Sequence, residues 1–139
     1  MKINSDIYFK MLACPSAPPE TGGILGSKNG IICEYFFDEG LANLSRAIYK
    51  PDINKLNKQI SIWSNERTAF CGIAHTHLLG QDSLSDDDII YIKSIMNSMP
   101  ASIKFLYFPI IIPKQHIFPY KAFRNGNNIS IVSSRLNIV

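Results

Sequence analysis

The sequence contains few cysteines, and none of them are close together. Cys14, Cys33 and Cys71 are the three, an odd number without the short CxxC spacing of a zinc knuckle. Disulfide frameworks of small secreted domains normally use an even number of cysteines. The cysteine content therefore favours reduced thiols and a cytoplasmic protein.

Long apolar runs and blocks of like charge are also missing. The most apolar stretch, IKFLYFPIII at 103–112, stops at Pro113, well short of the roughly 20 residues that cross a bilayer. The start, MKINSDIYFK, lacks the basic segment and long apolar run of a signal peptide. The net charge is only +3, and the basic residues are spread along the chain. We therefore expect neither membrane insertion nor secretion, and no nucleic-acid partner.

The sequence does contain enough apolar residues for a folded core. Of its 139 residues, 46% are hydrophobic, and no repeat or low-complexity linker divides them, so we expect one domain over residues 1–139. Periodicity and turn residues predict, in order, a brief helix near the start, a loop at 15–20, a β-hairpin of 22–27 and 30–40, a helix at 52–65, a strand at 68–77, a helix from Ser85 or Asp86 to Pro100, and two or three late strands within 102–134. This order predicts an α/β domain with one mixed sheet flanked by helices.

Two histidines stand at the end of the predicted strand 68–77, in the segment GIAHTHLLGQDSLSDDD. Alternate residues of a strand share a face, so His75 and His77 project together and Thr76 faces the other way. Two imidazoles on one face can bind zinc, which needs at least one more protein ligand, most plausibly an acid. By itself the pair is a weak signal, because histidines near strand ends are more often hydrogen-bonded surface residues.

The helix after the histidines begins with a serine and three aspartates. Ser85 and Asp88 have the spacing of a capping box, in which the serine and the acid exchange hydrogen bonds with backbone N–H groups. Acids in a first turn also interact favourably with the helix dipole. Capping alone would explain this pattern, but capping and metal binding are compatible, because Ser85 can start the helix while Asp88 turns toward an ion.

A catalytic zinc site also needs a group that accepts a proton from the bound water. Glu20 is the candidate, because it precedes a strand at Gly22 and Gly23, where another backbone segment can approach closely. The alternative is a solvated glutamate after a proline-rich turn. Asp38 and Glu39 are rival acids at a probable turn.

The spacing of these residues resembles the JAMM metalloprotease family, also called JAB/MPN domains. The family pattern is an upstream glutamate, His-x-His, seven residues, Ser, two residues and Asp. This chain has Glu20 in PETGGILG, then His75 and His77, then Ser85 and Asp88 at that spacing. Among the crowded acids, the match selects Asp88.

The resemblance covers about residues 19–112 and includes an E-x-GG-x-L-G hairpin entry. The chain departs from the family in two places: Leu78 stands where members often have proline, and the region before Glu20 is shorter than usual. Both departures affect the expected shape of the entrance.

The resemblance implies an MPN/JAB fold of the cytidine deaminase-like type and a peptidase or isopeptidase with one zinc ion and a bound water. By position, His75, His77 and Asp88 would hold zinc, Glu20 would carry the proton from water to the leaving amine, and Ser85 would stabilise the oxyanion. A donor beside the developing negative charge stabilises the transition state more than the ground state.

Family members commonly cleave after the C-terminal glycines of ubiquitin-like or sulfur-carrier proteins. The resemblance thus implies such a substrate, with activating or conjugating enzymes as further partners. A narrow groove suits an extended glycine tail, and residues 41–68 correspond to the region that helps form it. Within this region Trp63 is either a substrate contact or, by its place in the helical stripe, a core residue.

The sequence is also compatible with two other functions. An inactive MPN-like module could bind a ubiquitin-like protein without cleaving it, although such modules typically lack some ligands. A small-molecule zinc hydrolase or deaminase would normally carry a PCxxC run, which this sequence lacks. Cys71 would share the strand face of the histidines but lie about 13 Å from His75, and we interpret it as a buried residue and His116 as structural or exposed.

Overall fold

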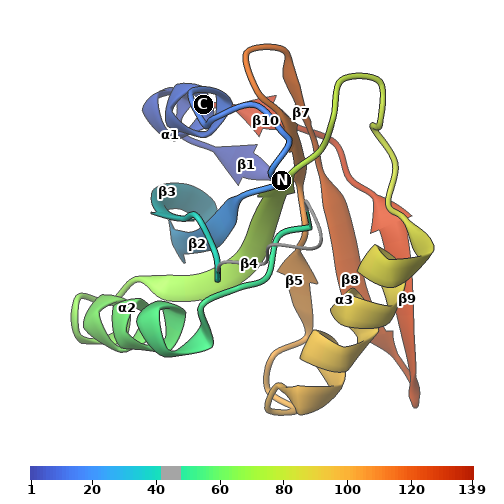
Figure 1. Cartoon of the computed structure of the whole chain (residues 1–139). Helices are drawn as coiled ribbons and strands as arrows, with labels where there is room; N and C mark the ends of the chain where they lie inside the picture. The colour runs from blue at the N-terminus through green and yellow to red at the C-terminus, as the bar shows by residue number, and fades with distance from the viewer. Residues whose placement is uncertain (42–47) are drawn as a thin grey trace.

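The computed structural model describes residues 1–41 and 48–139, which form a single mixed sheet with helices on both of its faces (Figure 1). The elements are β1 (Lys2–Ile3), α1 (Ser5–Leu12), β2 (Gly22–Lys28), β3 (Ile31–Asp38), α2 (Ile53–Asn65), β4 (Ala69–Thr76), α3 (Asp86–Ser98), β5 (Phe105–Tyr107), β6 (Ile110–Ile112), β7 (His116–Phe118), β8 (Tyr120–Asn125), β9 (Asn128–Ser133) and β10 (Asn137–Ile138). The predicted α/β class and mixed sheet are confirmed.

Strand β4 lies in the middle of this sheet. The main order is β10-β1-β3-β2-β4-β5-β8-β9, and β6 pairs with both β4 and β7. On one side β4 is antiparallel to β2, with His75 opposite Gly22. On the other side β4 is parallel first to β5 and then to β6, with His75 opposite Ile110. The end of β4 is thus held from both sides.

The predicted hairpin is confirmed as β2 and β3. Its turn is Asn29-Gly30, and both residues have positive φ angles, of 53° and 75°. Asparagine and glycine tolerate this backbone conformation, which two-residue hairpin turns require. The antiparallel pairing of β2 with β4 places the start of β2, next to Glu20, beside the end of β4.

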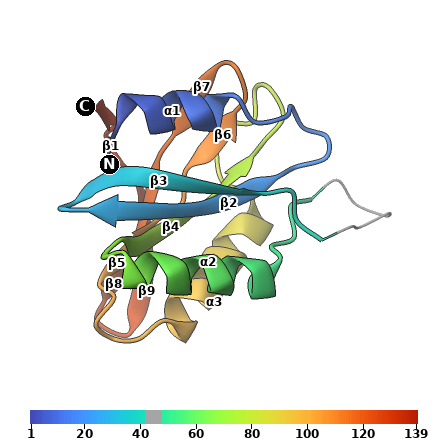
Figure 2. The same ribbon diagram turned by 90° about the vertical axis from the view of Figure 1, so that its left-hand side faces the viewer.

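The helices divide the core into two layers (Figure 2). Helix α1 packs on one face of the sheet, whereas α2 and α3 pack on the other. Successive residues of β2 point to opposite faces, so Leu25 belongs to the α1 layer and Ile24 to the layer of α2 and α3. Trp63 is 3% exposed in the second layer, which supports its interpretation as a core residue.

Helix α3 is fixed at both ends. Ser85 and Asp88 form the predicted capping box at its start. At its end, Arg124 of β8 donates from Nη2 to the backbone oxygens of Met96 and Met99, at 2.9 Å each. A cation at this end of a helix interacts favourably with the negative end of the helix dipole and donates hydrogen bonds to the carbonyls that have no partner within the helix. The last turn of α3 is therefore tied to β8, and the capping box fixes the local geometry of the first turn, which carries Asp88.

The late strands are more numerous than expected. Two prolines divide the predicted strands: Pro109 separates β5 from β6, and Pro119 separates β7 from β8. Proline has no N–H for the strand ladder, so each ladder is interrupted at that residue. The short strands β1 and β10, which pair with each other, were not predicted. Within residues 1–41 and 48–139, none of the helices has the length and apolar character needed to cross a membrane.

Candidate metal centre

The centre is built on the end of β4. The backbone N–H of His75 donates to Pro109 O at 3.3 Å, and that of His77 donates to Ile111 O at 3.0 Å. His77 lies one residue beyond β4, but its hydrogen bond to Ile111 of β6 still fixes its backbone. Both imidazole rings project from the same face, as predicted.

Thr76, between the two histidines, links this strand to the loop of Glu20. It is fully buried, and its Oγ1 accepts the backbone N–H of Thr21 at 2.9 Å. The backbone N–H of Thr76 also donates to Thr21 O at 2.8 Å. The residue next to Glu20 is therefore tied to the histidine strand. Sequence reasoning missed this role, although a polar residue on the buried face of the predicted strand was a usable signal.

The two imidazole rings bring their Nε2 atoms together. These atoms lie 2.8 Å apart, and His77 Nδ1 lies 2.9 Å from the carbonyl oxygen of Gln81. A carbonyl only accepts hydrogen bonds, so Nδ1 of His77 carries the proton. In the neutral ring this leaves Nε2 with a lone pair. Such an outer hydrogen bond also orients histidines that bind metals.

Asp88 completes the cluster. Its Oδ1 lies 3.2 Å from His75 Nε2 and its Oδ2 lies 3.1 Å from His77 Nε2. The same carboxylate accepts the backbone N–H of Ser85 at 3.0 Å, and Ser85 Oγ accepts that of Asp88 at 3.1 Å. One residue therefore caps α3 and contacts both histidines.

These contacts shift the ionisation of both partners. Burial favours the neutral form of His77, but its hydrogen bonds to Asp88 and to the Gln81 carbonyl raise its pKa above the ordinary value. Burial alone would raise the pKa of Asp88, whereas the two rings and the Ser85 N–H hold it well below its usual range. Asp88 is thus an anion facing two imidazole nitrogens.

The three groups are of the types that bind divalent cations. Two ligand atoms that lie about 2.0–2.1 Å from a tetrahedral zinc are about 3.3–3.4 Å from each other. The three contacts among His75, His77 and Asp88 measure 2.8, 3.2 and 3.1 Å, which are hydrogen-bond and ion-pair distances a little shorter than this spacing. The side chains would therefore have to move apart slightly to hold an ion.

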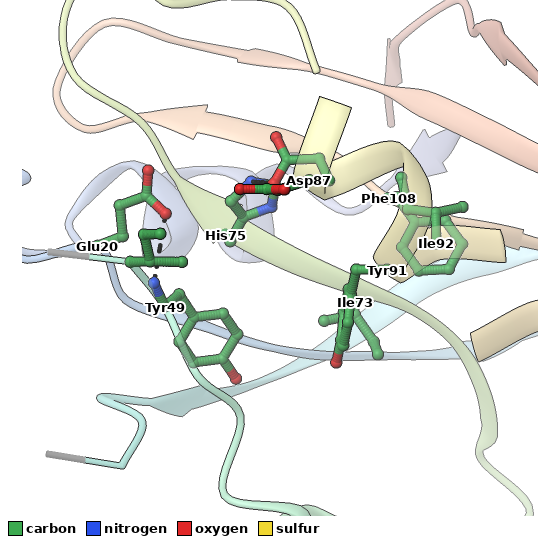
Figure 3. A pocket seen from close by; sticks show the side chains of 10 residues that line it. Glu20, Tyr49, Ile73, His75, Asp87, Tyr91, Ile92 and Phe108 are labelled. Carbon is green, nitrogen blue, oxygen red and sulfur yellow. Dashed lines mark hydrogen bonds and ion pairs between the residues drawn. The ribbon is translucent and has the colours of Figure 1, made fainter. Parts of the chain in front are cut away.

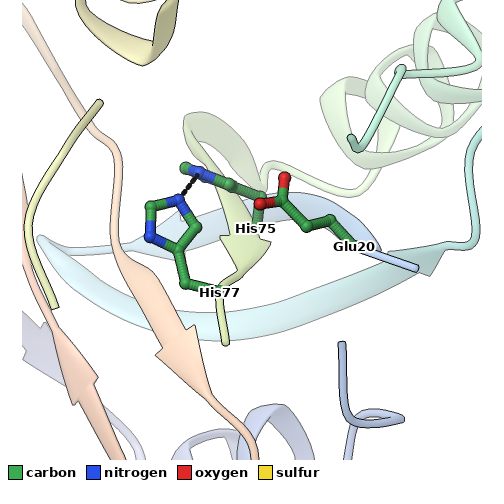
Figure 4. Close-up of side chains that lie close together, drawn as sticks. All are labelled: Glu20, His75 and His77. Carbon is green, nitrogen blue, oxygen red and sulfur yellow. Dashed lines mark hydrogen bonds between the residues drawn. The ribbon is translucent and has the colours of Figure 1, made fainter. Parts of the chain in front are cut away.

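Glu20 approaches the same histidines from the loop before β2 (Figure 4). Ligand atoms of Glu20, His75 and His77 all lie within 4.8 Å of one another. Glu20 Oε2 accepts the backbone N–H of Tyr49 at 3.3 Å. Glu20 and Asp88 are thus two carboxylates that each could complete a ligand set with the two histidines.

A cavity of about 310 Å³ opens beside the cluster (Figure 3). Glu20 and His75 stand on its polar side with Asp87 and Asp88. Its remaining lining is mostly apolar and consists of Ile48, Tyr49, Ile73, Tyr91, Ile92 and Phe108. Tyr91 was not recognised from the sequence, although it follows Asp88 by three residues and therefore shares its helix face.

Other candidate residues lie outside the cluster. The Cys71 thiol donates to Leu25 O at 3.4 Å, and burial raises its pKa to about 12, so it is a core residue. His116 is exposed and packs against the ring of Phe118. Asp38 is buried, and Glu39 is exposed. Of the expected groove region 41–68, residues 42–47 lie outside the described residues.

Comparisons with protein-family models and with curated proteins find no match. Among solved structures, the chain is similar to the solution structure of protein DSY2949 from Desulfitobacterium hafniense. The TM-score is 0.67 and the sequence identity 16%, over 99% of this chain and 93% of that chain. This likeness concerns the fold alone.

Proposed function

We propose that the chain is a zinc-dependent peptidase or isopeptidase of the JAMM type, with an MPN/JAB fold. The observation that carries the proposal is the position of Asp88, whose two carboxylate oxygens contact the Nε2 atoms of His75 and His77. Neutral imidazoles and a carboxylate are the ligand set of many hydrolytic zinc sites. The motif spacing described above adds independent support.

In this proposal His75, His77 and Asp88 hold the ion. When bound, zinc supplies a Lewis acid and a water molecule with a pKa near 7. The outer hydrogen bond from His77 Nδ1 to the Gln81 carbonyl keeps the Nε2 lone pair directed at the centre. The capping bond from the Ser85 N–H keeps the Asp88 carboxylate in place.

Glu20 is the general base. The N–H of Tyr49 donates to Oε2 of Glu20, which leaves Oε1 to receive a proton from the attacking water. Glu20 then delivers this proton to the leaving amine, because peptide hydrolysis needs a protonated amine as the leaving group. The cavity beside Glu20 is largely apolar, and exclusion of water strengthens such proton transfers.

Ser85 is the candidate oxyanion donor. The bond from the Asp88 N–H uses a lone pair of Ser85 Oγ, so the hydroxyl hydrogen can still be donated. Side-chain donors of this kind contribute about 10²–10³ in rate when they meet a developing oxyanion.

The proposed substrate is the C-terminal glycine tail of a ubiquitin-like or sulfur-carrier protein, in deconjugation or in precursor processing. The resemblance to the JAMM family supports this choice, together with the cavity that opens the cluster to a scissile bond beside Glu20. Glycine residues place no side chain near the ligands, so the scissile carbonyl can approach them closely.

The test compares two variants of purified protein. Wild-type protein should bind about one zinc per chain and cleave a reporter fused behind a Gly-Gly tail. Glu20→Gln should keep zinc but lose hydrolysis by a factor of about 10²–10⁴, whereas the exposed Glu39→Gln should leave both unchanged. Retained hydrolysis in Glu20→Gln would contradict the general-base role. A stable complex of zinc-loaded wild-type protein with the uncleaved substrate would instead indicate a binding module.

A further inference from the structure

The cavity beside the centre is larger than a glycine tail requires. Its volume is about 310 Å³, whereas a closed apolar cavity of about 150 Å³ already holds a benzene ring. Glycine has no side chain that could occupy such a space. The cavity therefore fits a bulky group of the substrate, next to the bond that is cleaved.

The wall of the cavity shows which chemical character this group has. Ile73, Ile92 and Phe108 present only hydrocarbon. The hydroxyl of Tyr49 is occupied, because it donates to Asp38 Oδ2 at 2.8 Å. The hydroxyl of Tyr91 is buried and has no hydrogen-bond partner among the described residues, so it is the one uncommitted polar group beside this otherwise apolar wall. The carboxylates in the lining are those of Glu20, Asp87 and Asp88.

The position of Glu20 shows which side of the scissile bond the cavity serves. Glu20, His75 and Asp88 line the cavity, whereas His77 lines a separate hollow of about 220 Å³ together with Ala17. In the proposed mechanism Glu20 gives its proton to the leaving amine. The amine nitrogen must therefore lie next to Glu20, at the mouth of the larger cavity, and the acyl part extends toward the His77 side.

We propose that this cavity binds the side chain of the residue whose α-amine is released, and that this side chain is large and apolar. The inference rests on the proposed function, because it uses Glu20 as the proton donor to the amine. It describes a substrate of the form Gly-Gly-X, in which X resembles phenylalanine or leucine. Ile73, Tyr91 and Phe108 are then the residues that select X.

A lysine isopeptide fits this cavity less well. Its amide nitrogen lies at the end of the lysine side chain, so the methylenes would enter first and the lysine backbone would follow. Peptide groups would then be buried among Ile73, Ile92 and Phe108, where hydrocarbon cannot satisfy their hydrogen bonds. The cavity thus favours linear tails over isopeptides.

The experiment measures binding and cleavage separately. Zinc-loaded Glu20→Gln is titrated calorimetrically with acetylated Gly-Gly-X-amide peptides in which X is glycine, alanine, leucine or phenylalanine, and with a Gly-Gly isopeptide on the lysine ε-amine. We expect the phenylalanine and leucine peptides to bind at least about tenfold tighter than the glycine peptide, since burial of a large apolar side chain is worth about 1.5–3 kcal/mol. Equal affinities, or tighter binding of the isopeptide, would overturn the inference.

Substitutions of residues that line the cavity test whether the side chain of X binds there. Ile73→Phe fills the cavity and should bring the affinity for the phenylalanine peptide down to that for the glycine peptide, while zinc content stays at the wild-type level. Phe108→Leu provides the test if Ile73→Phe fails to fold. It enlarges the cavity, so it should still bind the phenylalanine peptide and should shift the preference toward a tryptophan peptide. The matched control is Ile90→Phe, at an exposed position of α3, which should leave all affinities unchanged.

Wild-type cleavage separates this inference from the proposed function. If wild-type protein cleaves none of the peptides while the binding order holds, the proposed function fails, and only the binding of a large apolar side chain in the cavity stands. If it cleaves the glycine peptide as fast as the phenylalanine peptide, the proposed function stands and the cavity assignment fails.

Discussion

Asp38 and Asp88 are two carboxylates with lowered pKa values, but different kinds of neighbours hold them. Asp38, at the end of β3, is 1% exposed. Its partners among the described residues are donors: the Tyr49 hydroxyl at 2.8 Å, the backbone N–H groups of Gly40 and Asp52 at 3.0 Å each, and Lys55 Nζ at 3.5 Å. Burial opposes the charge of Asp38, and these donors nevertheless keep its pKa low.

The neighbours of Asp88 include two imidazole nitrogens, each of which can either donate a hydrogen or present a lone pair. Its capping partner, the Ser85 N–H, is a fixed donor. The Nε2 atoms of His75 and His77 lie beside it and 2.8 Å from each other, and the Nδ1 proton of His77 points away to Gln81 O. In the neutral form of His77 the Nε2 that faces the carboxylate carries a lone pair, whereas in the protonated form it donates to Asp88, which is a contact that raises the pKa of His77 against the effect of burial.

The difference separates a structural anchor from a candidate ligand. A carboxylate surrounded by donors is complete without any added ion, and removal of its charge leaves buried donors without an acceptor. A carboxylate beside imidazole lone pairs gains when a cation enters. Asp38 also ties residue 40 to residues 49 and 52, so it holds the backbone whose Tyr49 N–H contacts Glu20. Asp38 is thus a positioning residue for the site.

The largest expected effect is the loss of zinc binding in Asp88→Asn. The variant replaces an anionic ligand by a neutral amide, and we expect the affinity for zinc to fall by more than the roughly 100-fold upper range for outer-shell changes. Competition with a chromophoric chelator measures this. Asp87→Asn, which changes the neighbouring carboxylate of the same turn, is the control and should bind zinc like the wild type. Equal affinities in the two variants would mean that Asp88 is not a ligand.

The next effect is a loss of stability in Asp38→Asn. An asparagine NH₂ group would face the donors that now surround the carboxylate, so we expect the free energy of unfolding to fall by about 2–4 kcal/mol. Urea denaturation measures this, and the refolded variant should still bind zinc. A variant that loses zinc but keeps its stability would reverse the roles given to Asp38 and Asp88.

The pH dependence of Asp38→Asn provides a second measurement of the same role. The pKa of Asp38 is lower in the folded state than its ordinary value, so its stabilising effect is complete above about pH 4 and is lost as the pH falls through the folded-state pKa. The stability difference between wild type and Asp38→Asn should therefore shrink in acid, by at most about 1.4 kcal/mol per pH unit. A constant difference would show that the charge of Asp38 is not what stabilises the fold.

The parts of the candidate site that could be predicted from the sequence are those that depend on local spacing. The histidine strand, the capped helix and the acid at its third position depend on local periodicity and spacing, and the structure brings His75, His77 and Asp88 together. The candidate base Glu20 also reaches this cluster. Each of these residues stands at a start or an end of a regular element, where short-range patterns are informative.

The supporting residues could not be predicted because they depend on contacts between distant segments. Tyr49 meets Glu20 across 29 residues, and Thr76 meets Thr21 across 55. The side chain of Asp38 looked like a turn acid, and only the burial of its partners reveals an anchor. Gly22 is a similar case, since a side chain there would collide with the ring of Tyr49. Such long-range packing leaves no periodic trace in a single sequence.

The smallest expected effect belongs to Ser85→Ala. It removes the side-chain half of the capping box, and loss of a serine cap costs about 1 kcal/mol, but the backbone N–H of Ser85 still donates to Asp88. We therefore expect zinc affinity to stay at the wild-type level while thermal unfolding shows the small loss. The control is Ser98→Ala near the other end of α3, where the hydroxyl donates to Ile95 O and no ligand is near. If Ser85→Ala keeps zinc and loses hydrolysis by far more than 1 kcal/mol can explain, the hydroxyl of Ser85 acts on the transition state; if hydrolysis is unchanged, Ser85 is a cap alone and the oxyanion donor lies elsewhere.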